Sequence, residues 1–296
     1  LESLELNKKE VIVPAFSFFA TSEAIIQAGL VPKFVDVSIE DCNIDPEEIE
    51  NNISENTGAI LPVHLFGKSA NMIKLLSISK SHNLRIVEDT AQAFGTKVNG
   101  KFSGTIGDVG CLSFFPTKTL GAYGDGGAII TNDEKITQRA KMLKNHGASK
   151  KYYNEVIGYN SRLDSIQASF LDLKLQKINE NISDRIKAGK FYNEILKDNE
   201  NINIINNQDS SFNYYSILIK RGYRDKLQNY LNEADISSNV YYPKTLPSLP
   251  AHGITKTFPN AEYLAENILS IPIFPSIKEE QQLFVAEKIN DFFIKK

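Results

Sequence analysis

The sequence contains few of the residues by which metal sites and disulfide frameworks are recognised. It has two cysteines and four histidines in 296 residues. Cys42 and Cys111 lie far apart and lack the spacing of a disulfide framework or a metal site, so we expect reduced, inert thiols of a cytoplasmic protein. No two histidines are four residues apart and none has a cysteine neighbour, which excludes the usual zinc motifs.

Long apolar runs and an excess of charge of one sign are also missing. No run approaches the roughly 18 apolar residues that a membrane helix needs, and the opening LESLELNKKE is too polar for a signal peptide. Lys and Arg number 33 against 36 Asp and Glu, so the basic excess of a nucleic-acid-binding protein is absent. The remaining composition, 42% hydrophobic and 23% charged, is that of a globular protein with one large or two ordinary domains.

Short apolar runs alternate with helical patterns through the first half of the chain. This alternation predicts an α/β domain with a mainly parallel, buried sheet. The expected strands are 10–14, 32–37, 58–65, 84–88, 109–115 and 127–131, and the expected helices run from Thr21 or Ser22 to Ile26, over 70–82 and over 133–144.

The pattern changes at Leu163. Apolar residues recur at helical spacing from there to near Leu196, which predicts one long helical segment. Ser161 and Asp164 have the spacing of a capping box at its start. An asparagine-rich stretch, 199–207, then breaks the periodicity and predicts a loop or linker.

The remaining residues predict a second, smaller unit. Its expected elements are a strand at 213–220, a helix near 223–234, an extended segment at 237–242 and a C-terminal helix. We therefore predict a large domain over residues 1–200, including the long linking helix, and a small α+β domain over 201–296.

Lys118 is the residue whose surroundings point most clearly to chemistry. It follows the Ser-Phe-Phe-Pro run of residues 113–116 and precedes a turn that contains glycines 121, 124, 126 and 127. Lysines usually lie on the solvated surface, and a surface lysine beside a loop is the alternative interpretation. A partly desolvated amine, in contrast, can act as a nucleophile and form a Schiff base with a carbonyl.

Asp89 and Gln92 follow an expected buried strand, at the edge where α/β sheets bind ligands. Asp89 alone could simply cap the following turn. The two side chains together suit a heteroaromatic cofactor, because the Asp89 carboxylate can keep a pyridine nitrogen protonated and the Gln92 amide can bond a ring hydroxyl. With Lys118 these residues match the requirements of pyridoxal 5′-phosphate (PLP), which needs a Schiff-base lysine and an acid at its pyridine nitrogen.

Ordered motifs over nearly the whole chain resemble the DegT/DnrJ/EryC1/StrS family. These are fold-type I, PLP-dependent aminotransferases that act on nucleotide-linked keto-sugars. The resemblance implies an α/β fold with a large, mainly parallel sheet domain and a smaller C-terminal α+β domain. The motifs are VIVPAFSFFAT (11–21), PVHLFG (62–67), VEDTAQAFG (87–95), GDVGCLSFFPTKTLGAYGDGGAIIT (107–131), NHG (145–147), GYNSRLDSIQA (158–168) and ILSIPIFPS (268–276).

The resemblance implies a role for six residues. Lys118 carries the cofactor as a Schiff base, Asp89 pairs with its pyridine nitrogen and Gln92 with its ring hydroxyl. The other three are Ser113 at the phosphate, Phe18 against the face of the ring, and Asn160, which reaches the phosphate of the neighbouring subunit. A homodimer with shared active sites is therefore implied.

Alternatives stand beside some of these assignments. Phe18 and Ser113 also suit ordinary core and strand positions. His64, in PVHLFG, is better explained as a structural residue than as a catalytic base. Tyr242, in VYYPKTLP, could contact substrate, but tyrosines beside prolines are more often packing residues.

The implied reaction is transamination of a keto-sugar linked to a nucleoside diphosphate, with L-glutamate as the amino donor. Residues 151–175 most resemble the corresponding segment of family members that aminate C3 of dTDP-3-keto-6-deoxyhexoses. Members that aminate C4 of UDP- or GDP-sugars share most of the same motifs, so C4 is the alternative position. Some relatives replace the lysine with histidine and dehydrate their substrate. Retention of Lys118 argues against this aminodehydratase alternative.

The family also carries a Ser-Gly-Thr motif that binds the cofactor phosphate, before the stretch that corresponds to residues 1–14. This sequence begins after that point. We therefore expect either a fragment of a longer protein, which the non-Met first residue favours, or a naturally truncated, non-catalytic member.

Overall fold

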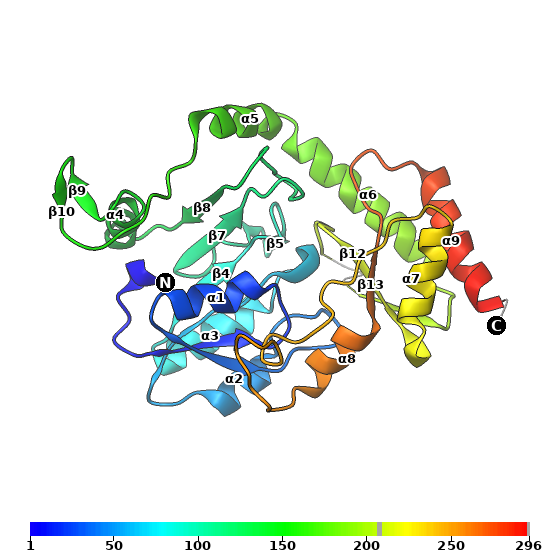
Figure 1. Cartoon of the computed structure of the whole chain (residues 1–296), viewed down its shortest axis with the longest axis horizontal. Helices are drawn as coiled ribbons and strands as arrows, with labels where there is room; N and C mark the ends of the chain where they lie inside the picture. The colour runs from blue at the N-terminus through cyan, green and yellow to red at the C-terminus, as the bar shows by residue number, and fades with distance from the viewer. Residues whose placement is uncertain (206–208, 295–296) are drawn as a thin grey trace.

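The computed structural model describes residues 1–205 and 209–294. Its main sheet has six strands in the order β2-β1-β3-β4-β7-β8 (Figure 1). Neighbouring strands are parallel except β8, which runs antiparallel to β7. The strands are β1 (Glu10–Pro14), β2 (Val31–Val35), β3 (Thr57–Ile60), β4 (Arg85–Asp89), β7 (Val109–Ser113) and β8 (Gly127–Ile130). The expected α/β class with a mainly parallel sheet is confirmed.

Helices and short hairpins surround this sheet. The helices are α1 (Phe19–Gln27), α2 (Pro46–Asn52), α3 (Met72–His82) and α4 (Glu134–Leu143), with short 3₁₀ turns at Glu2–Leu4 and Leu65–Gly67. The hairpins are β5 (Lys97–Val98) with β6 (Lys101–Phe102), and β9 (Ala148–Lys150) with β10 (Tyr153–Asn154). The β9–β10 hairpin projects away from the rest of the chain, at the left of Figure 1.

The start of α1 differs from the sequence prediction. The helix begins at Phe19, so neither Thr21 nor Ser22 caps it. The Ser22 hydroxyl donates to the Phe19 carbonyl, and the Thr21 hydroxyl donates to Asp89 across the sheet edge. Because a threonine hydroxyl serves a cap and a tertiary contact equally well, local sequence did not distinguish the two.

The long helical segment is divided into α5 (Ser165–Leu175) and α6 (Ile178–Leu196). The apolar periodicity continues across the break, which is why the pattern did not indicate it. The predicted capping box is wrong: Asp164 is the N-cap residue of α5, and its side chain makes no capping hydrogen bond.

A second sheet has the order β11-β12-β13 and is antiparallel. Its strands are β11 (Ile202–Ile204), β12 (Tyr215–Ile219) and β13 (Ile268–Ile271), accompanied by α7 (Arg224–Glu233), α8 (Pro259–Asn267), α9 (Glu279–Ile294) and a 3₁₀ turn at Lys220–Gly222. Strand β11 lies inside the asparagine-rich stretch 199–207, so the loop prediction is wrong there, while residues 206 and 207 lie outside the described part of the chain. Ile202 and Ile204 alternate with asparagine and pack into a buried cluster, which outweighs the turn preference of asparagine. In the segment 237–242, a single bridge from Asn239 to Ser270 takes the place of a strand.

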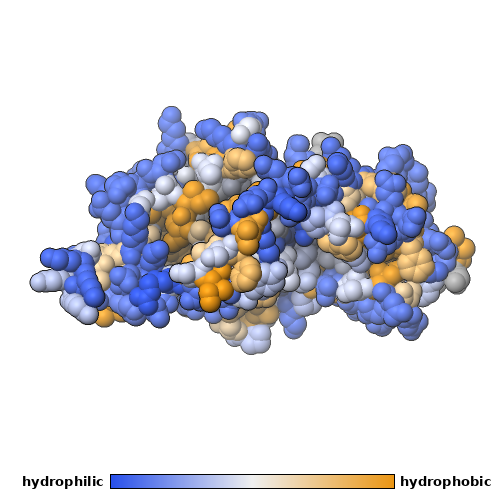
Figure 2. All heavy atoms as spheres, turned by 90° about the horizontal axis from the view of Figure 1, so that it is seen from above, coloured by the Kyte–Doolittle hydropathy of each residue, from blue (hydrophilic) through white to orange (hydrophobic). Residues whose placement is uncertain are grey.

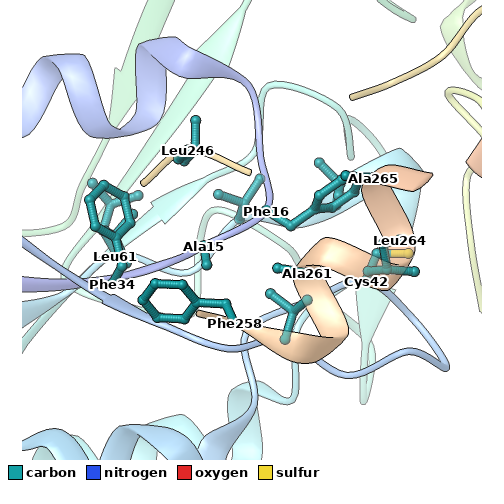
Figure 3. Close-up of a cluster of buried hydrophobic side chains, with 14 of the residues drawn as sticks. Ala15, Phe16, Phe34, Cys42, Leu61, Leu246, Phe258, Ala261, Leu264 and Ala265 are labelled. Atoms are coloured by element: carbon teal, nitrogen blue, oxygen red, sulfur yellow. The ribbon is translucent and has the colours of Figure 1, made fainter. Parts of the chain in front are cut away.

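A hydrophobic cluster connects the two sheets. Figure 3 shows Ala261 and Leu264 of α8 beside Ala15 and Phe16, which follow β1. The cluster contains residues on both sides of position 200, and the division into domains at 1–200 and 201–296 stays a prediction. Among the described residues, no helix combines the length and apolarity needed to cross a membrane.

Candidate active site

A cavity of about 870 Å³ lies where the carboxyl ends of the central strands meet. Its lining includes five of the six predicted site residues: Phe18, Asp89, Gln92, Ser113 and Lys118. They come from three segments that are separate in sequence, and the parallel topology brings them together.

Asp89 is the last residue of β4 and presents its carboxylate to the cavity. Oδ2 accepts a hydrogen bond from the Thr21 hydroxyl at 2.9 Å, and Oδ1 accepts one from the Ala91 backbone N–H at 3.1 Å. The Ala91 bond is the turn cap considered from the sequence. The same carboxylate also faces the cavity, so the two interpretations are compatible.

Gln92 is buried and its amide is held from both sides. Oε1 accepts from the Phe66 backbone N–H at 2.9 Å, and Nε2 donates to the Tyr242 hydroxyl at 2.9 Å. Tyr242, for which the sequence leaves open a substrate contact or a packing role, lies in the cavity lining beside a predicted cofactor ligand.

Lys118 is partly buried in a tight turn. Its backbone N–H donates to the Phe115 carbonyl, and a side chain at Gly121 would place Cβ 2.4 Å from the Pro116 oxygen, so the turn requires glycine there. Burial lowers the pKa of the Lys118 amine from its ordinary value, and the negative charge of Asp89 partly opposes this. The amine lies 5.6 Å from the centroid of the Tyr214 ring.

The other three predicted residues differ in their placement. The exposed Phe18 lies beside Tyr242, with ring centroids 5.9 Å apart. The Ser113 hydroxyl accepts from the Phe115 N–H at 3.2 Å. Asn160 is exposed, pairs through its backbone with Asn145, and is not among the residues that line the cavity.

Sequence reasoning missed Thr21, Tyr214 and Tyr241, which also line the cavity. The two tyrosines come from the part of the chain that carries the second sheet, and no spacing rule connects them to Lys118. His64 is fully buried and bonds Glu88 at 2.9 Å, and it is not among the lining residues. The described residues contain no group of three or more His, Cys, Asp or Glu side chains that could hold a metal ion.

The chain is similar in sequence to curated proteins over nearly its whole length. It is 42% identical to the pleiotropic regulatory protein of Geobacillus stearothermophilus, covering 96% of this chain and 78% of that protein. It is 38% identical to a UDP-N-acetyl-3-dehydro-α-D-glucosamine 3-aminotransferase of Acidithiobacillus ferrooxidans, covering 98% and 79%.

The structure is also similar to a solved crystal structure. This is the crystal structure of Streptomyces venezuelae DesV in complex with a ketimine intermediate. The two structures superpose with a TM-score of 0.94 at 33% sequence identity, and the match covers 99% of this chain and 80% of the DesV chain.

A family model confirms the resemblance stated from the sequence motifs. The model of the DegT/DnrJ/EryC1/StrS aminotransferase family matches residues 1–290. With this match, the expectation of an aminotransferase that uses PLP is also confirmed. The chain therefore belongs to the DegT/DnrJ/EryC1/StrS aminotransferase family.

Proposed function

We propose that this protein transfers an amino group to the keto carbon of a sugar linked to a nucleoside diphosphate. The observation that carries the proposal is the placement of Lys118, Asp89 and Gln92 around one cavity. The family membership and the aminotransferase names of relatives support the same reaction.

The residues present fit PLP. The cavity offers a partly desolvated amine at Lys118 and a carboxylate at Asp89 whose two oxygens are each held by one donor. Gln92 adds an amide whose orientation is fixed, and Ser113 adds a hydroxyl at the end of β7. We assign Lys118 to covalent attachment, Asp89 to the ring nitrogen, Gln92 to the ring oxygen, Ser113 to the phosphate and Phe18 to the ring face.

The protein supplies positioning and proton transfer. PLP, when bound, supplies an electron sink for the reacting carbon. Thr21 and the Ala91 N–H orient the Asp89 carboxylate, and the ionised carboxylate favours a protonated ring nitrogen. Nζ of Lys118 is placed to take a proton from the substrate carbon and to return it, because burial keeps a larger neutral fraction of this amine than water would.

We propose a sugar aminated at C3, with L-glutamate as the amino donor. The similarity to a protein named as a UDP-sugar 3-aminotransferase supports position 3. A dTDP-linked 3-keto-6-deoxyhexose is favoured because of the resemblance of residues 151–175, with C4 of a UDP- or GDP-sugar as the alternative. A cytoplasmic location is proposed as well, supported by the free thiols of Cys42 and Cys111.

We also propose a homodimer in which Asn160 serves the partner's site. Asn160 is exposed on its own chain and follows the projecting β9–β10 hairpin. These features suit a residue that reaches into a second subunit.

A substrate panel tests the proposed function. The protein is incubated with PLP, L-glutamate and dTDP-, UDP- or GDP-linked 3-keto and 4-keto sugars, and the products are identified by mass spectrometry. We expect an amino sugar from one 3-keto substrate and none with Lys118→Ala. A deoxygenated product without nitrogen would favour an aminodehydratase, and no product with any substrate would contradict the proposal.

A further inference from the structure

Tyr242 is joined to the proposed cofactor site by one direct hydrogen bond. Its hydroxyl lies 2.9 Å from Nε2 of Gln92, although 150 positions separate the two residues. The Tyr242 ring packs near Phe16 and Phe18, with centroids 6.0 and 5.9 Å away. Packing therefore holds the ring while the hydroxyl faces the amide.

The direction of this hydrogen bond follows from the other side of the Gln92 amide. The Phe66 backbone N–H can only donate, so the atom facing it at 2.9 Å is the amide oxygen. The amide nitrogen then faces Tyr242 and donates to its oxygen. Within residues 1–205 and 209–294, this is the only hydrogen bond of the Tyr242 hydroxyl, so its own proton has no acceptor among these residues.

Two unused donors therefore lie side by side at the cavity. Gln92 keeps its second amide N–H and Tyr242 keeps its O–H, and both residues line the cavity with Lys118. Burial raises the pKa of the Tyr242 phenol, which keeps that proton in place. Donor atoms 2.9 Å apart are close enough to donate to one common acceptor.

We propose that Tyr242 is a cofactor-binding residue, the second hydrogen-bond donor to the PLP ring oxygen that Gln92 binds. This inference rests on the proposed function, because it assumes that PLP occupies the cavity. Two donors to one oxygen favour its ionised form and strengthen cofactor binding.

The variant Tyr242→Phe tests the proposal because it removes the O–H and keeps the ring against Phe16 and Phe18. Two quantities are measured on the purified chain without substrate: the Kd for PLP, and the pH midpoint of the absorption change of bound PLP. The other titratable residues that line the cavity are Glu2, Asp89, Cys111, Lys118, Asp125, Lys144, Tyr159, Tyr214 and Tyr241, and the variant leaves all of them in place. We expect a Kd about tenfold higher and a midpoint at higher pH.

Tyr241→Phe is the matched control. Tyr241 also lines the cavity, and no described residue forms a hydrogen bond with its hydroxyl, so we expect wild-type values of both quantities. If Tyr242→Phe keeps the wild-type Kd and midpoint, the inference is overturned. It is also overturned if the variant changes only the KM for the nucleotide sugar, because the phenol would then serve the substrate.

Failure of the proposed function gives a different result. Wild-type protein that cannot be labelled at Lys118 by PLP and borohydride would overturn both the proposed function and this inference. Wild-type labelling together with an unchanged Tyr242→Phe variant would overturn this inference alone.

Discussion

At the residue scale, the proposed chemistry depends on the protonation of the Lys118 amine. The neutral amine is the form that attacks a carbonyl. Burial lowers its pKa below the ordinary value of 10.5, and Asp89 raises it again in part. The neutral fraction at a given pH is therefore larger than that of a lysine in water.

We predict that labelling of Lys118 reaches half its maximum below pH 10.5. The measurement is brief reductive methylation of the PLP-free protein over a range of pH, with the Lys118 peptide followed by mass spectrometry. Asp89→Asn removes the charge that raises the pKa of Lys118, so the pH midpoint of Lys118 labelling should be lower in this variant than in the wild type. The urea-unfolded chain is the reference, and a folded midpoint at or above 10.5 would contradict the prediction.

The residue types of the site were predictable because their chemistry is local. A lysine before a glycine-rich turn and an acid at a strand end are visible in short segments, and both face the cavity. Tyr214 and Tyr241 could not be predicted in the same way. Their position depends on how the second sheet packs against the first, and no local pattern encodes that packing.

At the scale of single elements, β4 is held by a buried hydrogen-bonded pair, a carboxylate and an imidazole, on its other side. Glu88 and His64 are both fully buried, and Oε2 of Glu88 lies 2.9 Å from Nε2 of His64. Nδ1 of His64 accepts from the Ala70 N–H, so the ring proton is on Nε2 and is donated to Glu88. The Glu88 carboxylate also accepts from the N–H groups of Gly104, Ile106 and Gly107.

We predict that Glu88→Gln lowers the free energy of unfolding by about 3 kcal/mol. Four donors converge on the carboxylate, and the NH₂ of glutamine would have to face at least one of them. Urea unfolding measures the change. Glu50→Gln, at an exposed position of α2, should change stability by less than about 0.5 kcal/mol.

The stability difference between wild type and Glu88→Gln should depend on pH in one direction. Burial alone raises the pKa of Glu88, but the bonds from His64 and the backbone outweigh it, so the pKa lies below its ordinary 4.5. An acid with a lowered folded pKa stabilises the fold above its unfolded pKa and loses that contribution as pH falls through the folded pKa. The difference in the free energy of unfolding between wild type and Glu88→Gln should therefore become smaller below about pH 4.5. A difference that stays constant with pH would argue against an ionised Glu88.

The class of most elements could be predicted, while several of their ends could not. Strand β1 has the predicted bounds because consecutive apolar residues, Val11–Val13, are buried on both sheet faces. The interruption between α5 and α6 was invisible because apolar spacing continues through it. The start of α1 could not be predicted because the Thr21 hydroxyl, which could have capped a helix, instead donates to Asp89, and the local sequence does not encode that tertiary contact.

At the scale of the whole molecule, α5 leaves an apolar stripe uncovered. Ile166, Phe170 and Leu173 recur at helical spacing and are 70%, 39% and 62% exposed. Figure 2 looks onto the α5 side of the molecule and shows hydrophobic atoms at the surface in the middle of this face. Exposed apolar patches of this kind mark protein interfaces, which supports the proposed homodimer.

If Asn160 serves the partner's site, two inactive variants should restore activity when mixed. We predict that Lys118→Ala and Asn160→Ala, unfolded together and refolded as a mixture, recover about a quarter of wild-type activity. Half of the dimers are then mixed, and each mixed dimer has one site with both an intact lysine and an intact partner asparagine. If Asn160 acted within its own chain, no site in the mixture would be complete.

The apolar stripe provides the control for this complementation. Placing Ile166→Glu and Leu173→Glu in both variants puts charges into the proposed interface, so the recovered activity should be lost and the molar mass by light scattering should fall to that of one chain. Leu283→Glu in α9 is the matched change, at an apolar side chain that is 50% exposed away from α5, and should preserve both. Recovery that survives the stripe substitutions would show that the two chains meet through another surface.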